Sequence, residues 1–349
     1  MRTCIDALCD MLRHGKTAAL ATLVACRGSA PREPGAALLA DESGLIRGTV
    51  GGGAAEAAAL SACREVLADG NARLLRIAMN NDAAAAEGMA CGGTVTLWVE
   101  AVAPTQENAM LFDRARDALA RNGFTFVRPL DESHEYGHTL LADGVFNGAP
   151  LEAEAREGVL DTLARQGGFI EPAVLAFAGR EYFVASFAPP SRMIIAGGGH
   201  VAVPTARIAA LAGFAVHVLD DRPEFALPER FPDALSTRVV PEFADCFSAL
   251  APTQNTFIVI VTRGHRYDGN VLAQALATEA GYIGMIGSRK KRDFLYAELR
   301  AQGVDDAALE RVQCPIGLSI GARTPEEIAV SIVAECIAHK RNAEAHGRV

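Results

Sequence analysis

Three glycine-bearing segments of this chain carry residue types that bind anionic ligands. They are Gly51-Gly52-Gly53, Cys91-Gly92-Gly93 and Gly197-Gly198-Gly199-His200. A triglycine at the start of a helix exposes successive backbone N–H groups and the positive end of the helix dipole, which together attract a phosphate. The first triglycine opens an alanine-rich stretch, 57–67, that has the composition of a helix. Glu56 then lies in the first turn, where its carboxylate either complements the dipole or accepts a hydrogen bond from a heterocycle.

Cys91 is the cysteine with unusual neighbours. It stands before Gly92 and Gly93, and the alternating run 94–99 after them predicts a strand. A thiolate on such a turn would be accessible beside free backbone N–H groups. The local sequence alone favours the other alternative, a buried turn cysteine. The eight cysteines form no CxxC pair, which excludes a zinc ribbon and fits a reducing cytoplasm.

The third glycine segment has the context of a nucleotide-binding fold. The apolar run 193–196 predicts a buried strand, Gly197 a tight turn, and Gly199 a close approach of backbone to phosphate. Ala202 is the small third residue that lets helix pack on strand. Asp220 ends the next predicted strand, where a carboxylate would accept a hydrogen bond from a ribose hydroxyl.

Two later loops belong to the same predicted rim, because ligands of parallel α/β sheets bind outside the carboxyl ends of the strands. The apolar run 257–261 leads into a loop with Arg263, His265 and Asp268. A shorter strand leads into Ser288-Arg289, followed by three more cations at the start of a helix. That cluster binds phosphate or forms a solvated basic helix face, and the sequence does not choose between the two.

Length and composition predict two α/β domains. The chain has 349 residues, and Pro189-Pro190-Ser191 is its clearest boundary. We expect an N-terminal α/β domain with glycine-rich loops over 1–188, including a weakly patterned connecting region over 129–188. A C-terminal Rossmann-like doubly wound parallel sheet would follow over 191–349. His134 and His138 fall in the weakly patterned region, where a solvated loop is expected and a metal pair is not.

Charge and hydropathy exclude several partners. Acidic residues outnumber basic ones by 42 to 33 and the net charge is -9, so we expect no binding to nucleic acid or to an anionic membrane. The first residues do not form a secretory signal, and no apolar run reaches transmembrane length. The expected location is therefore the cytoplasm.

Taken in order, the motifs resemble the XdhC/CoxI family of xanthine dehydrogenase accessory proteins. The segments that carry the resemblance are Gly28-Ser29-Ala30-Pro31-Arg32, Gly51-Gly52-Gly53 with Glu56, Cys91-Gly92-Gly93, Gly199-His200-Val201, the segment from Asp220 to Ala226, the loop from Thr262 to Asp268, the strand and turn from Tyr282 to Arg289, and the segment from Pro315 to Ile332. The resemblance spans nearly the whole chain in family order and is weakest over 129–180.

The resemblance implies a chaperone for the molybdenum cofactor (molybdopterin) rather than a turnover enzyme, so no catalytic residue is assigned. Such a protein binds the cofactor, supports its sulfuration with a cysteine desulfurase and inserts it into a xanthine dehydrogenase-like molybdenum hydroxylase. Exchange of a cofactor between proteins is compatible with a homodimer. With the resemblance added, Cys91 becomes the favoured contact for molybdenum or sulfur. Residues and resemblance together give this cofactor-binding set: Arg32, Gly51, Gly52, Gly53, Glu56, Cys91, Gly92, Gly93, Gly197, Gly199, His200, Asp220, Arg263, His265, Asp268, Ser288 and Arg289.

Two alternatives stay open beside the chaperone. One is an NAD(P)-dependent oxidoreductase that uses Gly197, Gly199 and Asp220, with His265 as proton donor. The other is a docking protein whose Rossmann half binds the hydroxylase without cofactor. One branch of the family has a cysteine after the triglycine, where this chain has Ala54, so it is closer to the xanthine dehydrogenase-type branch.

Overall fold

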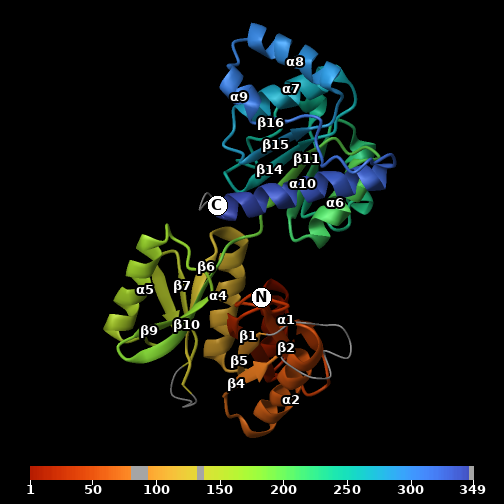
Figure 1. Ribbon diagram of the computed structural model, residues 1–349. Helices are drawn as coiled ribbons and strands as arrows, with labels where there is room; N and C mark the ends of the chain where they lie inside the picture. The colour runs from red at the N-terminus through yellow and green to blue at the C-terminus, as the bar shows by residue number, and fades with distance from the viewer. Residues whose placement is uncertain (80–92, 132–136, 346–349) are drawn as a thin grey trace. The chain divides into compact units, whose positions relative to one another are not determined.

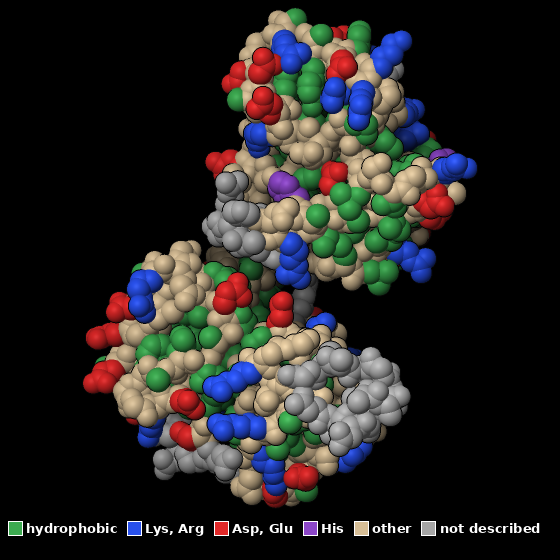
Figure 2. All heavy atoms as spheres, viewed as in Figure 1, with side chains coloured by type: hydrophobic (Ala, Val, Ile, Leu, Met, Phe, Trp, Pro, Cys, Tyr) green, Lys and Arg blue, Asp and Glu red, His purple; other side chains and the backbone are tan. Residues whose placement is uncertain are grey.

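The structure is a computed structural model that describes residues 1–79, 93–131 and 137–345 (Figure 1). The chain divides into two compact units, Met1–Pro189 and Pro190–Val349. On the face shown in Figure 2, acidic and basic side chains are interspersed over each unit rather than gathered by sign. Within the described ranges, every helix is too short or too polar to cross a membrane.

The first sheet of unit 1 is antiparallel, with the strand order β3-β2-β1-β5-β4. Its strands are β1 (Ala18–Arg27), β2 (Ala37–Ala40), β3 (Ile46–Gly48), β4 (Arg73–Ala78) and β5 (Thr94–Val102). Helix α2 (Gly53–Asp69) packs on this sheet through Ala55, Ala59 and Ala62, which are buried against Leu38 and Leu97. The small side chains recur at helical spacing and let the helix lie close to the strands.

The second sheet of unit 1 is also antiparallel and has the order β8-β7-β6-β10-β9. Its strands are β6 (Phe124–Pro129), β7 (Thr139–Ala142), β8 (Val145–Gly148), β9 (Ala173–Phe177) and β10 (Arg180–Phe187), and α5 (Ala153–Arg165) packs on them. The weakly patterned region 129–188 therefore contains most of a sheet. Strands of four or five residues contain too few alternations to show a clear period.

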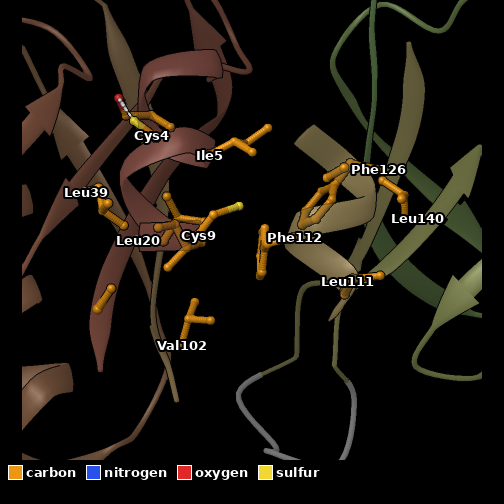
Figure 3. Close-up of a cluster of buried hydrophobic side chains, with 14 of the residues drawn as sticks. Cys4, Ile5, Cys9, Leu20, Leu39, Val102, Leu111, Phe112, Phe126 and Leu140 are labelled. Carbon is orange, nitrogen blue, oxygen red and sulfur yellow. Dashed lines mark hydrogen bonds between the residues drawn. The ribbon is translucent and has the colours of Figure 1, made fainter. Parts of the chain in front are cut away.

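One apolar core joins the two sheets of unit 1. Helices α1 (Arg2–Arg13) and α4 (Gln106–Arg121) contribute to it together with strands of both sheets. Figure 3 shows Cys9 of α1 and Phe112 of α4 pointing toward one another, with Leu20 of the first sheet and Phe126 of the second nearby. The two sheets are thus parts of one folded unit.

A buried charged cluster also links the two sheets. The guanidinium of Arg128 (Nη2) lies 2.7 Å from Oε2 of Glu100, and Nε2 of His138 lies 2.8 Å from its Oε1. All three side chains are buried. Burial by itself disfavours the charged form of Glu100, but His138 and Arg128 outweigh that effect and lower its pKa to about 2. The prediction of a solvated loop was wrong for His138, because its buried ring packs against Phe112 and Phe126 and its Nε2 contacts Glu100. His134 lies outside the described residues.

Unit 2 is the predicted doubly wound fold. Its six strands are parallel in the order β13-β12-β11-β14-β15-β16. They are β11 (Arg192–Ala196), β12 (Ala215–Asp220), β13 (Ser236–Val239), β14 (Thr256–Ile260), β15 (Tyr282–Met285) and β16 (Val312–Gln313). The order reverses between β11 and β14, which is where ligands of such sheets bind.

Helices cover both faces of this sheet. Side chains alternate along β11, so that Met193 and Ile195 face one core and Ile194 and Ala196 the other. The first core also contains residues of α6 (Ala202–Leu211) and α10 (Pro325–Ala345). The second contains residues of α7 (His265–Leu276) and α8 (Arg289–Ala301), and the short α9 (Asp306–Glu310) precedes β16.

Candidate functional site

Glycine segments that are distant in the sequence meet at one end of the first sheet of unit 1. A Cβ on Gly51 would stand 2.8 Å from Cγ of Pro31, and a Cβ on Gly93 would stand 2.3 Å from the carbonyl oxygen of Ser29. Both approaches are too close for any side chain, so only glycine allows them. The loop 28–34, the first triglycine and Gly93 therefore form one structure, which we call the glycine junction.

The glycine junction contains the start of α2. Gly52 is the N-cap residue and Gly53, with φ of 57°, is the first residue of this helix of 17 residues. Both glycines are exposed, and no described heavy atom lies within 4 Å of a Cβ placed on either. Open space thus adjoins the helix end that carries the partial positive charge.

Glu56 is held by Thr49 at the same junction. The Thr49 hydroxyl contacts Oε2 of Glu56 and also accepts a hydrogen bond of 3.1 Å from the Gly51 N–H. Glu56 is half-buried. One of its oxygens therefore orients the triglycine loop, a role that the sequence did not indicate.

Cys26 is a functional candidate that sequence reasoning missed. It lies near the end of β1, and its Sγ is 3.5 Å from the carbonyl oxygen of Arg32 in the junction loop. Among the cysteines that the structure describes, it is the only one that is not buried. Cys26 pairs with Val95 of β5, which stands two residues after Gly93. No local sequence signal indicates this pairing, because it depends on the register between β1 and β5. The Arg32 side chain is exposed, and Cys91 and Gly92 lie outside the described residues.

Thiol labelling is expected to distinguish Cys26 from the buried cysteines. Burial, and to a smaller extent the charge of Glu33, raises the pKa of the Cys26 thiol, whereas burial raises that of Cys63 to about 12. Iodoacetamide should therefore modify Cys26 in the native protein, and faster as the pH rises, while Cys63 reacts only after denaturation. Peptide mass spectrometry measures both, with the Cys91 peptide scored separately; equal native labelling of Cys63 would contradict this exposure pattern.

The carboxyl-end rim of unit 2 holds the second group of predicted residues. Gly197 has φ of 111°, and a Cβ on it would stand 2.5 Å from the carbonyl oxygen of Val261. Gly199 has open space beside it, and His200 is exposed. Asp220 is 1% exposed, and its Oδ2 accepts a hydrogen bond of 2.7 Å from the Gly198 N–H. The glycine turn and the carboxylate are thus neighbours, as the motif predicts.

The remaining predicted residues of unit 2 have local partners. Arg263 donates to Oδ2 of Asp221 at 2.8 Å. The buried Asp268 accepts from Thr262 at 2.6 Å and forms an ion pair with Lys291. Ser288 is the N-cap of α8, and the side chain of Arg289 is exposed. His265 begins α7, and its side chain lies outside what the structure describes.

The predicted residues therefore form two groups, one in each unit. Gly51, Gly93 and the loop with Arg32 meet in unit 1, and Gly197, Asp220 and Arg263 meet in unit 2. In the described part of the chain, no group of three or more His, Cys, Asp or Glu residues could hold a metal ion.

Comparison with known proteins places both units in one family. Residues 193–336 match the XdhC Rossmann domain, and residues 11–78 match the XdhC and CoxI family. A Bacillus subtilis protein named as a probable xanthine dehydrogenase subunit is 29% identical over 96% of each chain. The molybdenum cofactor insertion chaperone PaoD of Escherichia coli is 24% identical over 96% of this chain and 87% of its own.

Two further matches differ in how much they cover. The uncharacterized protein YqeB of Escherichia coli is 32% identical over 46% of this chain, and the match spans only 29% of its length. The crystal structure of a xanthine dehydrogenase from Bacillus halodurans has a TM-score of 0.78 and 26% identity, covering 97% of this chain and 96% of that one. The Bacillus subtilis protein and the Bacillus halodurans structure therefore match both units of this chain, in the same order, along nearly the whole length. This chain belongs to the XdhC/CoxI family of accessory proteins.

Proposed function

We propose that this chain binds the molybdenum cofactor at the glycine junction of unit 1 and delivers it to a xanthine dehydrogenase-like molybdenum hydroxylase. The observation that carries the proposal is the contact of Gly51 with Pro31 and of Gly93 with Ser29, which assembles the junction from separate segments. The homologue PaoD is named a molybdenum cofactor insertion chaperone, which supports the same role. A cysteine desulfurase is the proposed partner for sulfuration.

The described residues of the junction suit the two ends of such a cofactor. Gly52 and Gly53 leave open space at the N-terminus of α2, where backbone N–H groups attract a phosphate. Arg32 is exposed on the adjoining loop and adds a positive charge. Cys26 offers a soft thiol, and Cys91 stands two residues before Gly93 in the sequence.

Each residue would have a limited task. When bound, the cofactor would supply a molybdenum atom that already carries sulfur ligands. Thiols are the protein side chains that match such a soft metal site. Cys91 would contact molybdenum or the transferred sulfur, and Gly53 and its neighbours would hold the phosphate. Thr49 would keep Glu56 and the triglycine loop in place through the contacts described above. The site would hold the cofactor and release it to the hydroxylase, without a turnover reaction of its own.

The test is retention of molybdenum and pterin by the purified protein. The protein is incubated with cofactor released from a donor enzyme, desalted, and assayed for both components. We expect near-stoichiometric retention, a fall of at least about tenfold in Cys91→Ala, corresponding to about 1.4 kcal/mol, and normal retention in Cys63→Ala. The Cys63 side chain is buried away from solvent and serves as the matched thiol control.

Three outcomes would each count against a part of the proposal. No retention by the unaltered protein would refute cofactor binding and favour docking to the hydroxylase alone. Equal retention in the Cys91 and Cys63 variants would remove the role of Cys91. Loss in the Cys26→Ala variant alone would transfer that role to Cys26.

The NAD(P)-dependent oxidoreductase is the weaker alternative. The carboxylate of Asp220, which would bind the ribose, already accepts hydrogen bonds from Gly198 and Arg222. The side chain of His265 lies outside what the structure describes, so its role as a proton donor stays a prediction.

A further inference from the structure

Two neighbouring helices of unit 2 expose apolar side chains on the same side. Helices α6 and α10 pack against each other and cover one face of the parallel sheet. Because they lie side by side on that face, their outer surfaces point away from the sheet together. Figure 2 shows hydrophobic side chains gathered over these two helices. An exposed apolar surface that spans two helices indicates an interaction site.

The outer side of α10 has a regular pattern. Five residues share it because they follow one another at spacings of three or four, and they are Glu326, Val330, Ala334, Ile337 and Arg341. Val330 is 48% exposed and Ile337 is 40% exposed, with the half-buried Ala334 between them. The core side of the helix carries other residues, such as Ile332 and Cys336. We call the five outer residues the α10 stripe; its centre is apolar and its two ends are charged.

Helix α6 widens this apolar surface. Pro204, Ile208 and Leu211 recur at helical spacing, away from the buried Ala202 and Ala206. Leu211 is 81% exposed, the largest exposed fraction among the large apolar side chains that the structure describes. Covering such a side chain with a second protein surface removes apolar area from water, which favours association.

The charges of the α10 stripe are complementary to those of a second copy. Glu326 lies in the first turn of α10 and Arg341 near its other end. If two α10 helices pair antiparallel with Glu326 of each copy facing Arg341 of the other, the same register places Val330 opposite Ile337. A parallel pairing in register would instead place each charge opposite its own copy, which is unfavourable.

The same register defines where a twofold axis would pass. It lies between positions 333 and 334, at the middle of the α10 stripe. The small side chain of Ala334 there allows the two helices to approach closely. A surface that matches itself in this way is typical of an isologous interface, in which the same residues of both copies meet.

We propose that α10 forms the interface of a homodimer, in which the α10 stripes of two copies pair antiparallel about a twofold axis. Val330 and Ile337 form the apolar centre, and Glu326 and Arg341 form an ion pair at each end. Ile208 and Leu211 of α6 enlarge the contact. The proposal concerns unit 2 and does not rest on cofactor binding by unit 1.

The first test is sedimentation equilibrium of the full chain over a range of concentrations. We expect a dimer whose Kd rises at least about tenfold in Ile337→Glu, because the twofold axis brings the new charge into the apolar centre twice. Leu160→Glu is the matched control. Leu160 is 46% exposed on α5 of unit 1, so its variant should associate as the unaltered protein does.

Charge reversal tests the register. Glu326→Arg alone and Arg341→Glu alone should each raise the Kd, because each places like charges opposite one another at both ends of the interface. The double variant exchanges the two ends and should restore the Kd of the unaltered protein. The differences among the variants should shrink in high salt, which screens exposed charges.

Oxidative cross-linking tests the twofold axis. Ala334→Cys should form a disulfide between copies, because position 334 lies beside the axis. Val330→Cys should not, because an offset of seven residues separates its two copies by about 10 Å along the helix, and a disulfide needs Cα atoms within about 7 Å. Val330→Cys combined with Ile337→Cys should cross-link again. Peptide mass spectrometry without reduction distinguishes these links from any through the native cysteines.

Three results would overturn the proposal. They are a monomer at every concentration, which would leave the surface to a different partner, an unchanged Kd in Ile337→Glu, and cross-linking of Val330→Cys as efficient as that of Ala334→Cys. If thermal melting shows that Ile337→Glu is unfolded, Val330→Glu carries the same expectation. Cys91→Ala should dimerise normally, so failure of either proposal leaves the other testable.

Discussion

Glu100→Gln is expected to lower the free energy of unfolding of unit 1 by about 3–5 kcal/mol, the range for breaking a buried ion pair on one side. The substitution keeps the volume and removes the charge. The buried Arg128 would then lose the charged acceptor that lies 2.7 Å away, and His138 would lose an ionised acceptor. Because the three residues come from both sheets of unit 1, the loss should destabilise the whole unit rather than one strand.

Urea denaturation followed by the fluorescence of Trp98 measures this effect. Trp98 is the one tryptophan of the chain, and the Arg128 guanidinium lies 5.3 Å from its ring centre, so it reports on unit 1 at the cluster itself. Glu181→Gln is the matched control, since Glu181 is exposed on β10 of the same unit. A shift in Glu100→Gln no larger than in the control would show that the cluster contributes no net stability.

The same carboxylate gives the stability a defined pH dependence. The folded pKa of Glu100, about 2, is below its ordinary value of 4.5, so the folded state favours the ionised form. The stabilisation is fully present above the unfolded pKa and is lost as the pH falls from that value toward the folded one. The difference between the unaltered protein and Glu100→Gln should therefore shrink as the pH falls below about 4.5.

Gly93→Ala is expected to disrupt the glycine junction while leaving unit 2 folded. The new methyl group would stand 2.3 Å from the carbonyl oxygen of Ser29 and 2.8 Å from that of Arg27. Both are backbone atoms and cannot rotate away, so the loop must shift, at a cost of about 1–3 kcal/mol. Retention of molybdenum and pterin should then fall at least about tenfold, because the loop and the triglycine no longer meet.

Gly52→Ala is the control for that substitution. Gly52 belongs to the same junction, but its φ of -107° suits any residue and nothing described lies within 4 Å of the added methyl group. Its free energy of unfolding should change by no more than about 1 kcal/mol, the usual range for an N-cap position. Gly52→Ala is a control for stability alone, because Gly52 borders the proposed phosphate position. Equal losses of stability in both variants would mean that the close packing at Gly93 is not what holds the junction together.

Some of the site was predictable because its signals are local. The start of α2 after the triglycine, the turn at Gly197 and the position of Asp220 follow from residues within about one motif length. The involvement of Cys26 and Thr49 was not predictable in the same way. Cys26 joins the junction through its register with Val95, and Thr49 through a side-chain contact with Glu56.

The sequence by itself determined the family, the parallel sheet of unit 2 and the glycine segments. Apolar runs such as 193–196 and 257–261 and the turns after them act within a few residues, so they can be read along the chain. Only the tertiary structure decided the second sheet of unit 1, the cluster around Glu100 and the contact of Arg222 with Asp220. Glu100 and His138 are 38 residues apart, and a contact over that distance depends on strand pairing and core packing, which no local pattern encodes.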